Sequence, residues 1–197
     1  MFAQTPAPSA ALMDPAALKE KAPEKFNVKF ATTAGEFTIE VNRSWSPLGA
    51  DRFYNLVKNH FFDQSAFFRF VTDFVIQFGL PADPQIATVW LHATIPDDRH
   101  NNSNDLGTVV FANAGPGTRT TQIFINMHDN ADLDSQGFTP FGRVSSGMSV
   151  VDKLYSGYGE KPEQGRIRSE GKAYLDRNFP KLDTIASTTI VVPPAKK

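Results

Sequence analysis

Arg69 is the residue of this chain whose surroundings point most directly to chemistry. It follows Phe67 and Phe68 and precedes Phe70 and Phe74, so a charged group stands within a run of apolar residues. Burying such a charge is costly unless the charge has a partner or a task. A guanidinium keeps its proton in proteins and can only donate hydrogen bonds. Arg69 is therefore either a structural arginine that holds a carboxylate or a donor directed at a ligand.

Other polar groups are set among apolar, strand-forming residues in the same way. Gln77 lies in residues 65–79 with Arg69, and Asn113 and Gln122 lie in residues 110–126. Both segments are expected to be strands. The excess of phenylalanine, with 17 residues against four tyrosines, favours an aromatic core or an apolar binding groove.

The two segments resemble the active-site strands of the cyclophilin family, the peptidyl-prolyl cis-trans isomerases. The first is similar to the family's Phe-His-Arg-x-x-x-x-Phe-x-x-Gln-Gly-Gly stretch. The second is similar to its Met-Ala-Asn-Ala-Gly-Pro-x-Thr-x-x-Ser-Gln-Phe-Phe-Ile stretch. The two motifs occur in the family's order, and the resemblance extends over residues 25–158.

The resemblance implies a catalytic arginine at the edge of an apolar pocket. Arg69 takes the catalytic position, Phe74, Phe124 and Leu133 line the proline pocket, and Val75 lies beside them. Gln77 and the backbone of Asn113 hold the peptide, Ala112 and Gln122 complete the groove, and Phe138 closes it.

The reaction that the resemblance implies is rotation about the X-Pro peptide bond. Amide resonance sets a barrier of about 18–20 kcal/mol to this rotation. A guanidinium can donate to the prolyl nitrogen as that nitrogen becomes pyramidal, and an apolar pocket strengthens the interaction. No nucleophile, metal or cofactor is required, so we expect none.

The chain departs from the family pattern at several positions, which puts its substrate preference in question. Phe68 stands in place of a histidine, Thr72 of a proline, Val75 of a methionine, Ile123 of a phenylalanine, Asp132 of a tryptophan that contacts cyclosporin, and Phe138 of a histidine.

Several other chemistries are excluded or disfavoured by the sequence. The absence of cysteine excludes disulfides, thiolate catalysis and zinc-thiolate sites. Asp129, Asp132 and Asp134 lack the glycine and glutamate positions of an EF-hand. The histidines have no metal-ligand spacing, so we expect no metal site.

Charge and hydropathy limit the partners. The net charge of −1 argues against a nucleic-acid partner, and no apolar run approaches the length of a membrane span. The expected partners are proline-containing peptides and unfolded proteins, bound by a monomer. The alternative function is a non-catalytic peptide-binding or chaperone-like module on the same fold.

The periodicity predicts many short strands and a few helices. Residues 26–30 and 37–41 alternate as a hairpin, and Ser46-Pro47 begins a helix whose face carries Phe53, Leu56, Val57 and His60. Residues 138–144 and 184–192 are expected as strands, and residues 146–155 as a second helix. A further helix is expected to end before Pro180, whereas residues 81–105 form a long connection with a structure or function of its own.

The fold class that these elements and the resemblance imply is mainly β. We expect a closed, eight-stranded antiparallel β-barrel capped by two α-helices, with an extra C-terminal helical segment.

The chain is expected to form one domain. Residues 1–24 are rich in alanine and proline and predict a flexible leader, followed by a single domain over residues 25–193. Residues 3–6 resemble the start of a mature exported protein, so a periplasmic or secreted location is favoured over a cytoplasmic one. A plain disordered tail is the alternative.

Overall fold

The computed structural model describes residues 10–99 and 101–191. Its strands are β1 (Lys25–Thr32), β2 (Gly35–Asn42), β3 (Arg69–Val71), β4 (Val75–Phe78), β5 (Thr108–Phe111), β6 (Ile123–Asn126), β7 (Pro140–Ser146) and β8 (Ile185–Val191). Its helices are α1 (Pro47–Lys58), α2 (Pro84–Trp90), α3 (Met148–Val151), α4 (Gln164–Glu170) and α5 (Lys172–Asn178), with 3₁₀ turns η1 (Ala10–Met13) and η2 (Ala131–Gln136). Over these residues, no helix is both long and apolar enough to cross a bilayer.

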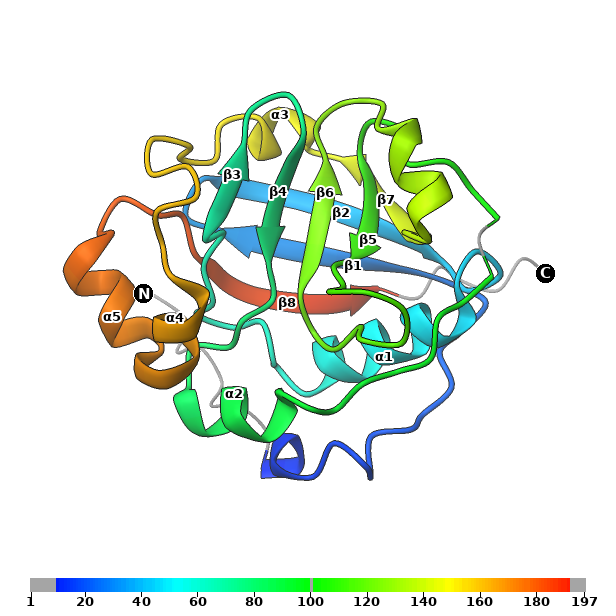
Figure 1. Cartoon of the computed structure of the whole chain (residues 1–197), viewed down its shortest axis with the longest axis horizontal. Coiled ribbons are helices and arrows are strands. Elements are labelled where there is room, and N and C mark those ends of the chain that lie inside the picture. The colour runs from blue at the N-terminus through cyan, green and yellow to red at the C-terminus, as the bar shows by residue number, and fades with distance from the viewer. Residues whose placement is uncertain (1–9, 100, 192–197) are drawn as a thin grey trace.

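The strands form one eight-stranded sheet in the order β3-β4-β6-β5-β7-β2-β1-β8, and all its pairs are antiparallel. The sheet curls over, so that β3, β4, β6 and β5 cross in front of β2, β1 and β8 (Figure 1). Helix α1 lies at one open end of the curled sheet and α3 at the other (Figure 1). The mainly β, eight-stranded antiparallel prediction is confirmed.

The barrel is not closed by a full ladder, which corrects that part of the prediction. The terminal strands β3 and β8 are not neighbours in the sheet. The segments that precede them are joined instead, by a bridge between Ala66 and Thr184 and by hydrogen bonds such as Phe67 N–H to Asp183 O (3.1 Å). The outer edge of β3 is partly occupied by a loop, since Phe70 N–H donates to Gly159 O (3.1 Å). A three-residue strand with that edge taken cannot form a ladder with β8.

The predicted hairpin is the centre of the core. Alternate residues of β1 and β2 are buried, and Phe30 stacks on Phe37 with ring centroids 4.9 Å apart. Phe53, Leu56 and Val57 of α1 pack into this core as expected. His60 does not share their face: it lies beyond the end of α1 at a φ of 62°, because the chain turns out of the helix there.

The start of α1 is capped by a distant carboxylate. Ser46 and Pro47 occupy the predicted positions, but the side chain of Ser46 does not cap the helix. Asp98 accepts hydrogen bonds from the backbone N–H groups of Leu48 (3.0 Å) and Gly49 (2.9 Å) instead. The long connection of residues 81–105 therefore has a structural role here, and it also contains α2.

The C-terminal helical segment consists of two helices where one was predicted. Gly171 separates α4 from α5 with φ 61° and ψ −147°, a backbone conformation that is nearly restricted to glycine. The Lys172 N–H next to it donates to Ala82 O (2.9 Å), which docks this junction beside the start of α2. Helix α3 is also shorter than predicted: β7 continues to Ser146, and the helix already ends at Val151.

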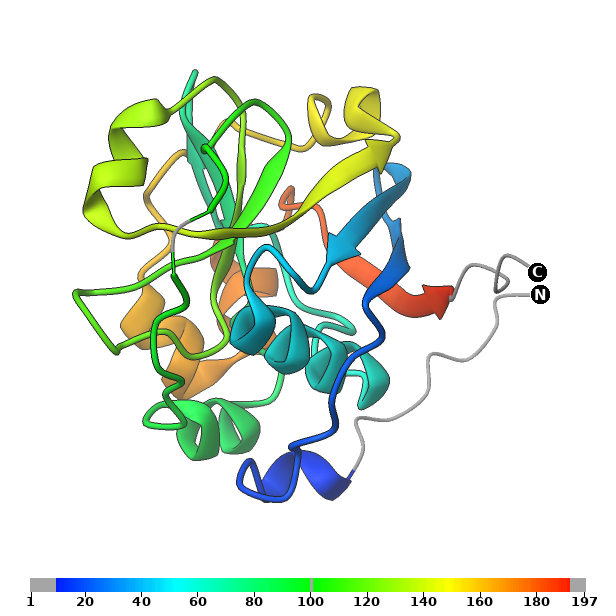
Figure 2. The same cartoon turned by 90° about the vertical axis from the view of Figure 1, so that its right-hand side faces the viewer.

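Residues 10–24 pack against the domain, which differs from the expectation of a flexible leader. Leu12 is fully buried, and its carbonyl accepts a hydrogen bond from Trp90 Nε1 (2.8 Å). Ala22 is buried too, and its N–H donates to Asp51 Oδ1 (2.9 Å). Figure 2 shows η1 beside α2 and the following segment passing along α1. Residues 1–9, Val192 and the predicted domain end at residue 193 lie outside the described residues.

Candidate active site

The sheet register brings the central site residues into one row. Arg69 of β3 is paired with Gln77 of β4, Gln77 with Phe124 of β6, and Phe124 with Val110 of β5. Directly opposite residues point to the same face of a sheet. The neighbours Ile76, Phe78, Ile123 and Ile125 point the other way, into the main core. The outer face of these short strands therefore carries a row of two polar side chains, Arg69 and Gln77, followed by two apolar ones, Phe124 and Val110.

An apolar pocket lies on this face, separate from the main core. Val75, Phe124 and Leu133 are buried in it together with Val110. Phe74, Ala112 and Phe138 are partly buried around them, and the rings of Phe124 and Phe138 meet edge to face at 5.7 Å. A site with these walls is suited to a small apolar ring such as that of proline.

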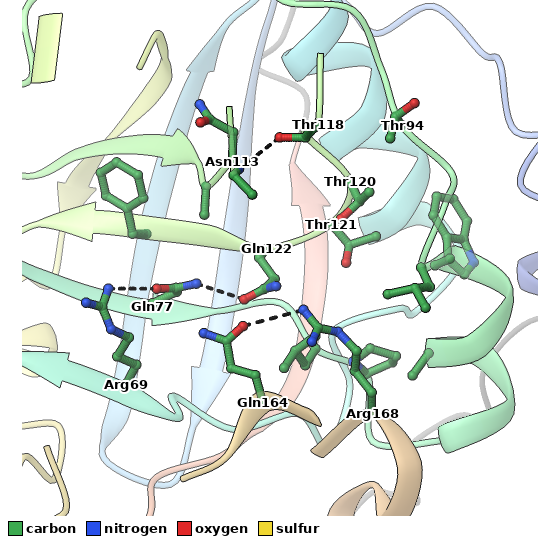
Figure 3. Close-up of a pocket in the computed structure, with 18 of the residues that line it drawn as sticks. Arg69, Gln77, Thr94, Asn113, Thr118, Thr120, Thr121, Gln122, Gln164 and Arg168 are labelled. Atoms are coloured by element: carbon green, nitrogen blue, oxygen red, sulfur yellow. Dashed lines mark hydrogen bonds between the residues drawn. The ribbon is translucent and has the colours of Figure 1, made fainter. Parts of the chain in front are cut away.

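A relay of hydrogen bonds leads from Arg69 along the pocket. Arg69 Nη1 donates to Gln77 Oε1 (3.0 Å), and Gln77 Nε2 donates to Gln122 Oε1 (2.8 Å), as Figure 3 shows. The relay sets the orientation of both amides. It leaves Gln122 Nε2 without a partner among the described residues, so this group can donate to a bound peptide.

The other side of the Arg69 guanidinium is held by Glu160. Glu160 Oε2 accepts from Nε and lies 2.7 Å from both Nε and Nη2. Glu160 belongs to the loop between α3 and α4 that also contacts β3 through Gly159. Arg69 therefore does hold a carboxylate, as the structural alternative for this residue predicts. The Arg69 side chain is nevertheless still 30% exposed and lines the cavity.

All ten site residues that the resemblance implies line one cavity of about 570 Å³. They are Arg69, Phe74, Val75, Gln77, Ala112, Asn113, Gln122, Phe124, Leu133 and Phe138. The cavity continues beyond them to α2, the segment after it and α4, where Trp90, Thr94, Gln164 and Arg168 also line it (Figure 3).

The sequence analysis missed Glu160, Gln164 and Arg168. The only local signal for the last two was their separation by four residues, which places both on one face of a helix. Nothing in that spacing indicates that the face meets a cavity formed by β4 and β6.

The polar residues before β5 support the far wall of the pocket. Asn104 Nδ2 donates to Phe138 O (2.9 Å) and to Asp134 Oδ1 (2.7 Å), and Ser103 Oγ donates to Asp134 Oδ2 (2.6 Å). These bonds fix the turn η2, which carries Leu133. The end of the 81–105 connection therefore positions two residues of the apolar pocket.

A partly buried arginine links the segments on the opposite side of the cavity. Arg52 Nη1 donates to Ala93 O (2.6 Å) and Thr120 O (3.0 Å), and its guanidinium lies 5.0 Å from the Trp90 ring centroid. Burial, with a smaller contribution from the nearby Arg119 charge, lowers the pKa of Arg52 to about 10. Arg52 remains charged at neutral pH and links α1 to the segments that carry Thr94 and Thr120.

Sequence comparisons with known proteins identify the family of this chain. The family described as "Cyclophilin type peptidyl-prolyl cis-trans isomerase/CLD" has a model that matches residues 27–171. The chain is 34% identical over 131 residues to peptidyl-prolyl cis-trans isomerase ppi1 of Schizosaccharomyces pombe, covering 65% of this chain and 84% of that protein. It is 33% identical over 133 residues to a peptidyl-prolyl cis-trans isomerase of Acinetobacter baylyi, covering 64% and 70%.

The fold has known relatives as well. The crystal structure of a cyclophilin type peptidyl-prolyl cis-trans isomerase from Cryptosporidium parvum matches with a TM-score of 0.63 at 20% identity, covering 86% of this chain and 99% of that one. The same protein crystallised in the presence of the dipeptide Ala-Pro matches with a TM-score of 0.62. With its two motifs on one row of the sheet and its family match over residues 27–171, the chain belongs to the cyclophilin-type peptidyl-prolyl cis-trans isomerases.

Proposed function

We propose that this chain catalyses cis-trans isomerisation of X-Pro bonds in peptides and unfolded proteins, with Arg69 as its catalytic residue. The observation that carries the proposal is the setting of the Arg69 guanidinium. Gln77 and Glu160 hold it from two sides at the edge of the apolar pocket formed by Phe74, Phe124 and Leu133. A charged donor fixed beside a ring-sized apolar site is the arrangement that this reaction needs.

The proline ring is bound in the apolar pocket, where Phe124 and Leu133 exclude water. The carbonyl that precedes the ring remains free to rotate. During the rotation the prolyl nitrogen loses its conjugation, and its lone pair becomes available to a donor. Arg69 donates to that lone pair in the transition state and less so in either planar isomer, which lowers the barrier.

The remaining groove residues hold the peptide on either side of the rotating bond. Gln122 Nε2 can donate to a peptide carbonyl, and the Asn113 backbone offers a hydrogen-bonding edge beside Ala112. Binding energy at these positions orients the proline ring toward Arg69. The proposed chemistry uses no covalent intermediate.

The test is the rate of isomerisation of a short proline peptide with wild type and Arg69→Ala. We expect kcat/KM to fall by about 10²–10³, the scale for loss of one preorganised donor in a transition state. Arg69→Lys should recover little, since an ammonium on a flexible stem lacks the planar fork of donors that contacts Gln77, Glu160 and the substrate together.

The matched control is Arg143→Ala. Arg143 is an exposed arginine of β7 that does not line the cavity, so its removal should leave the rate unchanged. Far-ultraviolet circular dichroism confirms that each variant is folded. Near-wild-type activity in folded Arg69→Ala would contradict the proposed role.

A further inference from the structure

The cavity has a second end, away from the proline pocket. Figure 3 shows Gln164 and Arg168 of α4 reaching toward the segment that carries Thr120, Thr121 and Gln122. A cavity of about 570 Å³ is larger than one proline ring needs, so it can also accept a neighbouring residue of the peptide. The second end is formed by the C-terminal helical segment and by the 81–105 connection.

The charges on the cavity wall are all of one sign. Among the described residues, the charged side chains that line it are Arg69 and Arg168, and no aspartate or glutamate does. Glu160 compensates the charge of Arg69 from the side. Arg168 has no such partner in the described part of the chain, and its hydrogen bond there goes to the neutral amide of Gln164 at 3.4 Å.

This lack of a partner sets Arg168 apart from the other arginines with restricted solvent access. Arg43 is paired with Asp51 at 2.7 Å and Arg119 with Asp98 at 3.1 Å. Arg52 donates to two backbone carbonyls. Burial lowers the pKa of Arg168, so its surroundings disfavour the charge that it carries. An anion supplied from outside would compensate this charge.

We propose that Arg168 determines substrate specificity by binding the carboxylate of an aspartate or glutamate close to the proline of the substrate. The planar guanidinium matches a carboxylate with two parallel hydrogen bonds, and Gln164 holds the side chain toward the cavity. Extended chain advances by about 3.3–3.6 Å per residue, and Arg168 lines the same cavity as the proline pocket, so the acidic residue is expected within about three residues of the proline. This inference rests on the proposed function, because it assumes that the proline occupies the pocket at Arg69.

A purely structural role for Arg168 makes a different prediction. Arg168 lies in the last turn of α4, where a cation interacts favourably with the helix dipole. Removal of the residue would then lower stability and would leave peptide selectivity unchanged. The charge preference of the enzyme for its substrate separates the two roles.

The experiment compares matched peptides in which glutamate or glutamine occupies each of the three positions on either side of the proline. With wild type at low ionic strength, we expect kcat/KM to be about five- to tenfold higher for glutamate at the best position, the scale of one net hydrogen bond. The ratio should fall to about one in Arg168→Gln. Arg168→Glu should instead favour a third matched peptide that carries lysine at the same position.

Arg166→Gln is the control on the same helix. Arg166 is exposed, pairs with Glu170 at 2.8 Å and does not line the cavity, so this variant should keep the wild-type preference. A glutamate-to-glutamine ratio of about one at every position with wild type would overturn the inference. An unchanged preference in folded Arg168→Gln would overturn it equally.

Failure of the proposed function gives a distinct result. An enzyme that accelerates no peptide, including a neutral Ala-Pro peptide, contradicts isomerase activity itself. The Kd values of the fluorescently labelled glutamate and glutamine peptides then report the same ratio without catalysis. A wild-type preference for glutamate that Arg168→Gln abolishes supports the inference, whereas equal Kd values overturn it.

Discussion

At the scale of single residues, the candidate site depends on how one guanidinium is held. Arg69 has two neighbours of different origin: Gln77 is its cross-strand partner, whereas Glu160 reaches it from a loop 91 residues further along the chain. Both bonds restrict rotation of the guanidinium. Preorganisation of a donor lowers the cost of aligning it in the transition state. Glu160 is therefore a positioning residue for Arg69.

Glu160→Gln tests that role. We expect kcat to fall by about three- to tenfold with KM nearly unchanged, because a neutral amide holds the guanidinium less firmly in the reacting geometry. Stability should change by less than about 1 kcal/mol, since the ion pair is partly exposed. Steady-state kinetics and urea unfolding provide the two measurements.

The control for this variant lies in the same loop. Glu163 is exposed, and its side chain makes no capping hydrogen bond: its carbonyl accepts from Ile167 N–H at the start of α4, and its N–H donates to the Tyr174 hydroxyl. Glu163→Gln should therefore leave kcat unchanged. If Glu160→Gln kept the full kcat, Gln77 alone would be sufficient to position Arg69.

At the scale of elements, the junction of α4 and α5 decides where Arg168 lies. A Cβ atom at Gly171 would come within 2.2 Å of Ala82 O and 2.8 Å of Pro84 Cδ. The backbone there can approach the start of α2 only because glycine has no side chain. The position of α4 at the cavity thus depends on a residue that does not line it.

Gly171→Ala should destabilise the protein by about 2–4 kcal/mol, through the clash and the unfavourable backbone conformation. Gly165→Ala, within α4, is the matched control, because nothing lies within 4 Å of its added Cβ. That variant should be neutral or stabilising by about 0.5–1 kcal/mol, as alanine favours a helix. Urea unfolding of both variants measures the difference. Equal midpoints would show that the junction accommodates the added Cβ without loss of stability.

At the scale of the whole molecule, the N-terminal segment is part of the folded unit. Leu12 fills a buried site next to Trp90, and Trp90 lines the cavity from its other side. The segment therefore supports α2 from behind. Its docking connects the first described residues to the second end of the candidate site.

Leu12→Ala should lower the free energy of unfolding by about 2–4 kcal/mol, the range for a buried leucine that leaves a cavity. Met13→Ala is the control, because the adjacent Met13 is 49% exposed and its loss should cost little. Denaturant unfolding followed by Trp fluorescence measures both. If the two variants were equally stable, the segment would not be docked in solution.

The sequence by itself determined the family, the strands and the set of residues on the groove. Alternation in residues 26–30 and 37–41 is local, so burial of one face follows from the order of the residues. The two motifs predict strands that carry Arg69, Gln77 and Phe124. For this reason all ten implied site residues could be named without a structure, and they line one cavity.

Only the tertiary structure decided which distant segments meet these strands. The Arg69–Glu160 pair, the docking of Leu12 against α2 and the approach of Gly171 to Ala82 join residues that are far apart in the chain. Local composition predicts the opposite at the N-terminus, since an alanine- and proline-rich segment is typical of a flexible leader, whereas residues 10–24 are packed. Contacts of this kind leave no periodic pattern in the sequence, because each depends on the geometry of two elements and not on the spacing within one. The same holds for the missing ladder between β3 and β8 and for the position of Arg168 at the cavity, since both depend on how distant elements pack.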